Sequence, residues 1–240
     1  MSEPQAVPAA PESASSLRTI WQTLASPEAA FRSILAHPVW AVALLLLVAL
    51  GVAAVTIGFA KVTPEDYRRM VEESGQELPA EFDSEQLMSF ARWSTAVGVA
   101  VVSPLVYFIV GGLFLVVFRL LGSEVGYRQS LSVSVHGLLP LGVAAVVGIF
   151  IALARDTIDP IELQGGGLLM SNLGFLATEE TSKAMRALFT SADLFSVWCI
   201  FLLATGYRIV ARVSAGAAWG AVLAVWGVGV LLKVALAAAF

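Results

Sequence analysis

The sequence predicts an all-α membrane protein, a polytopic helix bundle with five transmembrane helices and additional short interfacial helices. Of the 240 residues, 58% are hydrophobic and only 13% are charged, whereas soluble domains average about 45–50% and 25%. The hydrophobic residues also gather in five blocks, each long enough to cross a hydrocarbon core that requires about 20 helical residues. The predicted spans cover about residues 38–60, 94–118, 130–154, 194–211 and 216–240.

The composition also excludes several classes of protein. So few charged side chains cannot cover a globular surface with polar groups, which excludes a soluble enzyme. The net charge of −4 provides no basic patch for a phosphate backbone, so we expect no nucleic-acid partner. A single cysteine, Cys199, excludes a disulfide-stabilised secreted domain. The partner that composition does predict is the lipid bilayer.

The segment before the first span divides into two parts. Residues 1–16 are rich in proline, serine and glutamate, and we predict a disordered tail because they bury too little apolar surface to offset the entropy of ordering. In residues 17–37, Leu17 and Trp21 begin an apolar stripe at helical spacing, and Pro27 follows a capping serine. We therefore predict one or two amphipathic helices, which could lie in the headgroup plane or pack on the end of the bundle.

Residues 38–240 form the predicted transmembrane domain. Asp83-Ser84-Glu85 favours a helix that begins before the second span and continues into it. Two connections, 122–129 and 213–215, are short and are bordered by arginines. With the N-terminus inside, the inner segments hold six basic and four acidic residues, and the outer segments hold eight basic and fourteen acidic residues. Basic residues beside short loops favour the cytoplasmic side, so we predict a cytoplasmic N-terminus and an outside C-terminus.

Two residues in the third span are candidates for a functional site. Ionisable groups within spans are costly in lipid, so they are the first place to look for function. His136 lies four residues before Pro140; a lone histidine there is typical of a hydrogen bond between helices, and it could instead relay protons or bind a ligand. Ser130, Ser132 and Ser134 precede it at a spacing that does not line one helix face, and we expect them in a turn at the membrane interface.

The fourth and fifth spans provide two further candidates, Asp193 and Lys233. Asp193 opens the fourth span, where its carboxylate can cap the helix or take part in ion binding. Lys233 can extend to the outer interface or form a structural ion pair with Asp193, since both lie toward the outer side. Gly216 and Gly220 form a small-residue face that suits close helix packing.

No motif in the sequence indicates catalysis. His37, His136 and Cys199 do not have the spacing of metal ligands. The sequence contains no nucleophile elbow, phosphate loop or dinucleotide-binding fingerprint. We therefore expect no enzymatic activity, no catalytic or metal-binding residues and no cofactor.

Three passages along the chain are SPEAAFRSILAHPVW, GSEVGYRQSLSVSVHGLLPL and DLFSVWCIFLLATGYRIV. Together they resemble the Yip domain family in its bacterial branch, over about residues 26–240. The residues that fit the family's motifs are Pro27, Phe31, Pro38, Gly122, Ser130, Pro140, Asp193, Phe195, Trp198 and Gly206. The resemblance implies a polytopic protein of the bacterial cytoplasmic membrane with a cytoplasmic N-terminus. Eukaryotic members interact with Rab-type GTPases, but their aspartate-leucine-tyrosine-glycine-proline signature does not occur here, so that partner is not carried over.

These features predict a non-enzymatic scaffold or adaptor, acting on other membrane proteins or on membrane organisation, and self-association fits the same prediction. The alternative is a transport protein for a small solute, an ion or a lipid, with a polar path near His136, Pro140 and Asp193. Proline within a span can open such a path. Whether His136, Asp193 and Lys233 meet at one cavity would distinguish a polar path from separate packed contacts.

Overall fold

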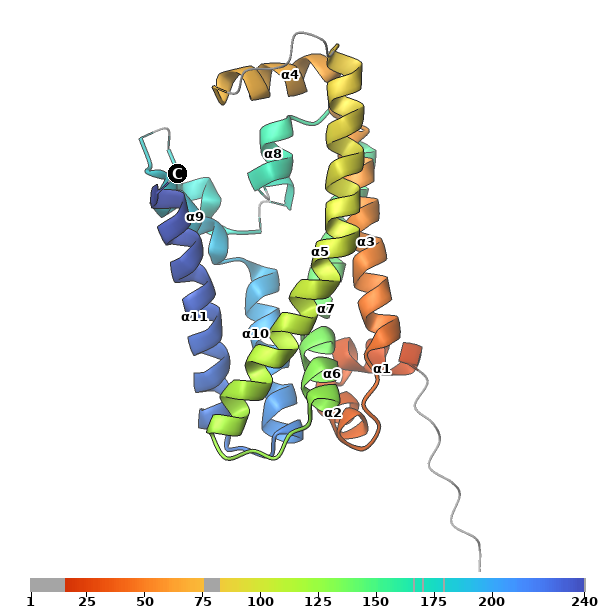
Figure 1. The fold of residues 1–240 in the computed structure, drawn as a ribbon, viewed down its shortest axis with the longest axis vertical. Helices are drawn as coiled ribbons and strands as arrows, with labels where there is room; N and C mark the ends of the chain where they lie inside the picture. Colours follow the sequence, from red (N-terminus) through yellow and green to blue (C-terminus); the bar gives the residue numbers. More distant parts are fainter. Residues whose placement is uncertain (1–15, 76–82, 166, 170, 179, 240) are drawn as a thin grey trace, which may run out of the picture.

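A computed structural model shows the chain as a bundle of α-helices (Figure 1). The structure describes residues 16–75, 83–165, 167–169, 171–178 and 180–239. Within these residues the regular elements are helices, apart from one isolated bridge between Asn172 and Asp193. The predicted all-α class is therefore confirmed. The predicted disordered tail lies outside the described residues except for Ser16, which begins the first helix.

Four helical segments of the described chain are long and apolar enough to cross a membrane. They are α3 (Ala41–Phe59), α5 (Ser84–Leu120), the consecutive α6 (Tyr127–Gly137) and α7 (Leu139–Ala154), and α11 (Ala215–Ala239). The remaining predicted span corresponds to α10 (Leu194–Val210), which is apolar but has only 17 residues. At 1.5 Å per residue α10 is about 25 Å long, shorter than a hydrocarbon core of ~30 Å. Length and composition thus support four of the five predicted spans.

The third predicted span is divided between α6 and α7 at Leu138. Pro140 lies in the first turn of α7, where its missing N–H group needs no helical partner, but it cannot continue the hydrogen-bond ladder of α6. Ser130, Ser132 and Ser134 lie inside α6 and are fully buried. The predicted interfacial turn at these serines is wrong because α6 begins at Tyr127 and packs between α5 and α10.

The longest helix, α5, extends well beyond the predicted second span. Asp83 caps it, with its Oδ1 atom accepting a hydrogen bond from the Gln86 amide at 2.7 Å. This confirms the predicted helix start before the span. Its 37 residues correspond to about 55 Å, so its first turns continue past the apolar part, where α4 (Pro64–Glu73) lies across its N-terminal end (Figure 1).

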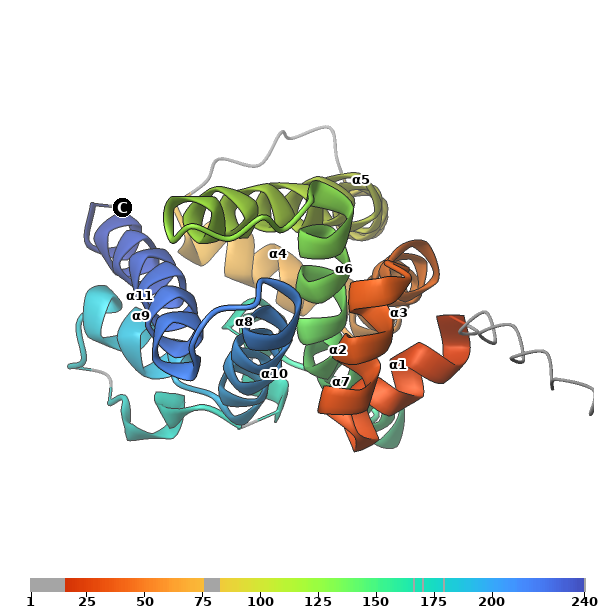
Figure 2. The same ribbon diagram turned by 90° about the horizontal axis from the view of Figure 1, so that it is seen from below.

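Two short helices, α1 (Ser16–Ala25) and α2 (Pro27–Ala36), cross the end of the bundle (Figure 2). The helix α2 buries Phe31 completely against the core, and its Glu28 forms an ion pair with Arg208 of α10 at 2.8 Å. In contrast, Leu17 and Trp21 of α1 are 68% and 71% exposed. The two helices therefore differ: α2 is part of the packed bundle, whereas α1 presents apolar side chains at the surface.

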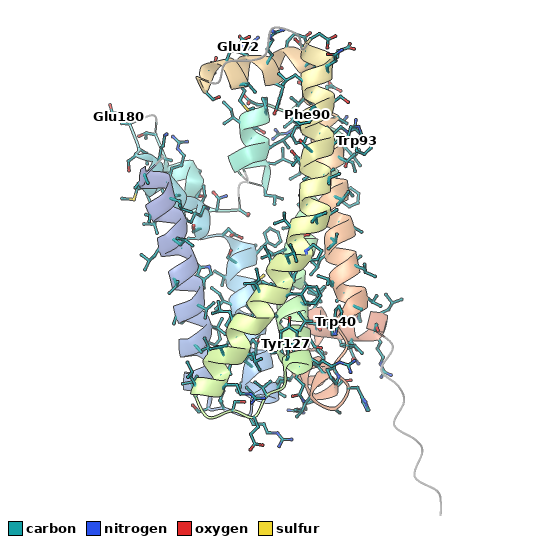
Figure 3. All side chains as sticks on the ribbon, in the orientation of Figure 1. Trp40, Glu72, Phe90, Trp93, Tyr127 and Glu180 are labelled. Atoms are coloured by element: carbon teal, nitrogen blue, oxygen red, sulfur yellow. The ribbon has the colours of Figure 1, made fainter. Side chains whose placement is uncertain are left out.

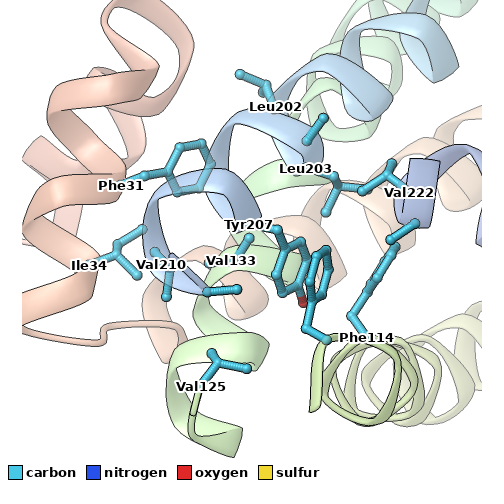
Figure 4. Packing of buried hydrophobic residues seen from close by; sticks show 14 of the residues in the cluster. Phe31, Ile34, Phe114, Val125, Val133, Leu202, Leu203, Tyr207, Val210 and Val222 are labelled. Carbon is cyan, nitrogen blue, oxygen red and sulfur yellow. The ribbon is translucent and has the colours of Figure 1, made fainter. Parts of the chain in front are cut away.

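The main hydrophobic core lies at the same end, among α2, α5, α6, α10 and α11 (Figure 4). Tyr207 of α10 is fully buried there and stacks on Phe118 of α5, with ring centroids 4.3 Å apart. Packing is so close that a Cβ atom on Gly206 would lie 2.7 Å from Val133 and 2.8 Å from Phe31. Helices α2, α6 and α10 are thereby joined into one packed unit.

The opposite end is covered by shorter helices. These are α8 (Pro160–Gly165), the 3₁₀ helices η1 (Gly167–Leu169) and η2 (Leu173–Leu176), and α9 (Lys183–Ser191). Figure 3 shows Phe90 and Trp93 toward this end of α5, and Trp40 and Tyr127 toward the other end of the bundle. Aromatic side chains at two levels are typical of the two membrane–water interfaces.

Candidate functional site

Two of the four predicted site residues, Asp193 and Lys233, line one cavity of about 330 Å³ between α10 and α11. The end of α9 adds Thr190 and Ser191 to its wall, and Trp226 lines it on α11. The cavity therefore combines a carboxylate, an ammonium group, hydroxyl groups and an indole ring. Neither His136 nor Pro140 lines it.

Asp193 occupies its position because it is the N-cap of α10. Its Oδ1 atom accepts hydrogen bonds from the backbone amides of Phe195 and Ser196, at 2.8 and 2.9 Å. Its Oδ2 atom accepts a further hydrogen bond from the Ser196 hydroxyl. A carboxylate at this position satisfies amides that have no partner within the helix and interacts favourably with the helix dipole. The cap fixes the carboxylate at the edge of the cavity.

Lys233 does not form an ion pair with Asp193, which was one of the two alternatives expected for it. Its Nζ atom instead donates a hydrogen bond to the Thr190 hydroxyl oxygen at 3.1 Å. Among the ion pairs of the described residues, none within 4.0 Å joins Asp193 to Lys233. The physical reason is that α9 offers the lysine a closer acceptor, while the backbone amides and hydroxyl of the α10 cap hold the carboxylate in place and leave one acceptor position on Oδ2. The two opposite charges thus face the cavity separately.

His136 lies apart from this cavity, inside α6. Its side chain is 1% exposed, and its Nδ1 atom is 2.9 Å from the carbonyl oxygen of Ser132. Its Nε2 atom has no hydrogen-bond partner among the described residues. Pro140 follows at the start of α7 and is also buried. The structure therefore does not bring His136, Asp193 and Lys233 to one cavity.

A buried hydrogen-bond cluster around Tyr207 is a feature that sequence reasoning missed. The Tyr207 hydroxyl is 2.8 Å from the Ser130 hydroxyl and 2.9 Å from the Ser134 hydroxyl. The Ser130 hydroxyl also donates to the Gly111 carbonyl oxygen at 2.7 Å. The signal available in the sequence was the i, i+4 spacing of Ser130 and Ser134, which places both on one helix face. This cluster connects α5, α6 and α10 through polar contacts within the apolar core.

A larger polar cavity, of about 610 Å³, lies between the two short connections. Ser123 ties them together because its hydroxyl donates to the Ala211 carbonyl oxygen at 2.7 Å. The next residue, Arg212, lines the cavity and has a φ of 55°, a left-handed conformation that costs a residue with a side chain roughly 1–2 kcal/mol. The sequence predicted these connections as short and basic, but did not predict that they enclose a cavity.

The described residues contain no group of three or more histidine, cysteine, aspartate or glutamate side chains that could hold a metal ion. A comparison with protein families finds that the model described as the Yip1 domain matches residues 21–236. No curated protein and no solved structure matches the chain.

Proposed function

We propose that this chain, which belongs to the Yip1 domain family of membrane proteins, is a non-enzymatic scaffold or adaptor. In this role it holds other membrane proteins through its exposed apolar helices. The observation that carries this proposal is the open face of α11. Its main packing partners are α9 and α10, and large apolar side chains such as Leu223 and Leu231 remain exposed. A helix packed on one side only offers its remaining surface to lipid or to another helix.

The open face of α11 is shaped for close helix contact. Gly216, Gly220 and Gly227 recur at i, i+4 and i+11, which places them within about 40° of one another around the helix axis. A Cβ atom added to any of the three would meet nothing within 4 Å. Small residues at such positions let the backbones of two membrane helices approach closely. We assign this face to a helix of a partner membrane protein. A helix from a second copy of the chain would contact the same face in the same way.

The proposed topology has five crossings, with the N-terminus in the cytoplasm and the C-terminus outside. It is supported by the direction of α10, which runs antiparallel to α11 (Figure 1). Helix α10 begins at the end that holds α9 and ends at the short connection between α10 and α11. If α11 crosses the bilayer, α10 must return the chain to the first side, and thinning of the bilayer can accommodate a short helix. We place the chain in the bacterial cytoplasmic membrane and α1, with its exposed Leu17 and Trp21, at the inner interface.

The test is a pull-down of the tagged full-length protein from membranes in mild detergent. We expect specific membrane proteins to copurify with the unmodified chain and to be lost from Gly220→Ile, because a branched side chain separates the helix backbones. Gly98→Ile on α5 is the matched control, since a Cβ atom there also meets nothing within 4 Å. Recovery of the same partners with Gly220→Ile would contradict the assignment of this face, and repeated recovery of the chain without any partner would contradict the adaptor function.

A further inference from the structure

We propose that the cavity between α9, α10 and α11 binds the headgroup of a phospholipid that carries both a phosphate and a primary amine, as in phosphatidylethanolamine. The cavity contains one carboxylate, Asp193, and one ammonium group, Lys233, which do not pair with each other. A single charge on the ligand would leave one of them without a partner of opposite sign. A zwitterion satisfies both.

The hydrogen-bond capacity that remains in the cavity fits such a headgroup. An ammonium group has three N–H donors, and Lys233 uses one of them on Thr190, which leaves two for phosphate oxygens. Each carboxylate oxygen has about two acceptor positions. The Oδ1 atom of Asp193 accepts two backbone amides, whereas Oδ2 accepts only the Ser196 hydroxyl. Oδ2 therefore retains one acceptor position, directed to a donor such as a primary ammonium.

The position of the cavity along the bundle axis matches the level of the lipid headgroups. Lys233 follows the first residue of α11, Ala215, by 18 positions, which corresponds to about 27 Å along the helix axis. That distance is close to the thickness of the hydrocarbon core, ~30 Å. Asp193 reaches the same level by capping the helix antiparallel to α11. In the proposed topology, on which this step rests, the charged groups thus lie near the outer boundary of the bilayer, where lipid phosphates are the abundant ligand.

The α11 wall provides the room for a lipid. The residues of α11 that line the cavity recur at i, i+3, i+4 and i+7, which is one face of the helix: Trp226, Gly229, Val230 and Lys233. A Cβ atom on Gly229 would meet nothing within 4 Å, so this glycine leaves open space between the indole and the ammonium group. Trp226 lies about 10 Å deeper than Lys233 along the axis, at the level where the glycerol and upper acyl chain of a bound lipid would lie.

The proposal is tested by titrating full-length protein in detergent micelles with lipids of identical acyl chains and counting bound lipids by native mass spectrometry. We expect phosphatidylethanolamine to bind about tenfold more tightly than phosphatidylcholine, because a trimethylammonium group has no N–H to donate to Asp193 and a hydrogen bond to a charged group is lost. Phosphatidylglycerol, which lacks an ammonium group, should also bind more weakly. Equal binding of the three lipids would overturn the proposal.

Three variants assign the binding to the cavity. Asp193→Asn keeps a capping oxygen but removes the charge, so the advantage of phosphatidylethanolamine over phosphatidylcholine should disappear. Lys233→Gln should weaken both lipids, and Gly229→Leu should block both by filling the open space. Lys61→Gln, a lysine that does not line the cavity, is the control and should leave both unchanged.

Two further results would overturn the proposal. The first is unchanged lipid preference in both Asp193→Asn and Lys233→Gln with unchanged unfolding temperatures. The second is binding of soluble phosphoethanolamine as tight as that of the lipid, which would assign the cavity to a soluble zwitterion. We expect Gly220→Ile to bind lipid as the unmodified chain does, because that glycine lies on a different face of α11. The lipid-binding test and the adaptor test can therefore fail independently.

Discussion

Removing one hydroxyl group, in the variant Tyr207→Phe, tests whether the buried cluster stabilises the bundle. The Ser130 hydroxyl has one hydrogen, which it donates to the Gly111 carbonyl oxygen. The Tyr207 hydroxyl must therefore donate to Ser130, whose hydroxyl and carbonyl oxygens lie 2.8 and 3.0 Å away. Ser134 is then the donor in its 2.9 Å contact with Tyr207. Each of these assignments follows from the number of hydrogens available.

Tyr207→Phe removes one hydrogen bond that the tyrosine donates and one that it accepts. At about 1 kcal/mol for each neutral hydrogen bond, the variant should lose about 2 kcal/mol of unfolding free energy. The ring stacking on Phe118 is kept, so no cavity forms. By contrast, Tyr207→Ala also removes the ring and should cost about 3–5 kcal/mol more than a surface substitution.

The assay is equilibrium unfolding in mixed micelles, followed by circular dichroism. Tyr127→Phe is the matched control, because its hydroxyl also donates to a carbonyl oxygen, that of Phe108 at 3.2 Å, but is exposed. We expect the control to change stability by less than about 0.5 kcal/mol. The double variant with Ser134→Ala should be less destabilised than the sum of the single variants, since both lose the same contact. A loss in Tyr207→Phe no greater than in Tyr127→Phe, or strict additivity, would refute the reasoning.

Substitutions at three other positions, two of them with a comparison variant, probe the fold by the same unfolding measurement. Gly206→Ala should destabilise the bundle by about 1–3 kcal/mol, because its Cβ atom would collide with Val133 and Phe31. Gly148→Ala, whose Cβ atom would meet nothing within 4 Å, should leave the stability unchanged, and equal effects of the two variants would contradict the packing argument. Asp193→Ala should cost about 1 kcal/mol through the lost cap, whereas Asp193→Asn should cost less; equal losses would show that charge rather than capping matters. Arg212→Gly should stabilise the protein by roughly 1 kcal/mol because glycine adopts a positive φ without strain, and a destabilised variant would show that the arginine side chain makes a compensating contact.

Local features of the fold could be predicted from the sequence, and features that depend on distant residues could not. The cap at Asp83 acts on the amide of Gln86, three residues away, so a short segment contains all the information. The α6–α7 break is local too, because Pro140 restricts the residues just before it, although residues 130–154 were predicted as one span. The bounds of α10 were also predicted, since Leu194–Val210 differs by one residue from the expected span 194–211. The contact between the two distant connections, in which the Ser123 hydroxyl donates to the Ala211 carbonyl oxygen, could not be predicted.

The candidate site shows the same limit. The sequence placed Asp193 and Lys233 toward the same side of the membrane, and they do line one cavity. It could not show that Thr190, from a helix between two apolar spans, would accept the hydrogen bond of the lysine. The partners of Tyr207 were missed for a related reason, since Ser130 and Ser134 are 77 and 73 positions away in the chain.

The uneven distribution of the core gives the molecule one rigid end and one compliant end. Around Tyr207, residues from α2, α5, α6, α10 and α11 are buried together, whereas the other end is covered by short helices that join the spans. Amide hydrogens in α6 and in the half of α10 near Tyr207 should exchange with solvent most slowly, since exchange there requires opening of the packed unit. The halves of α5 and α11 that lie away from Tyr207 should then move apart by small angles without unfolding, so the end covered by short helices can widen or narrow as the surrounding bilayer changes thickness.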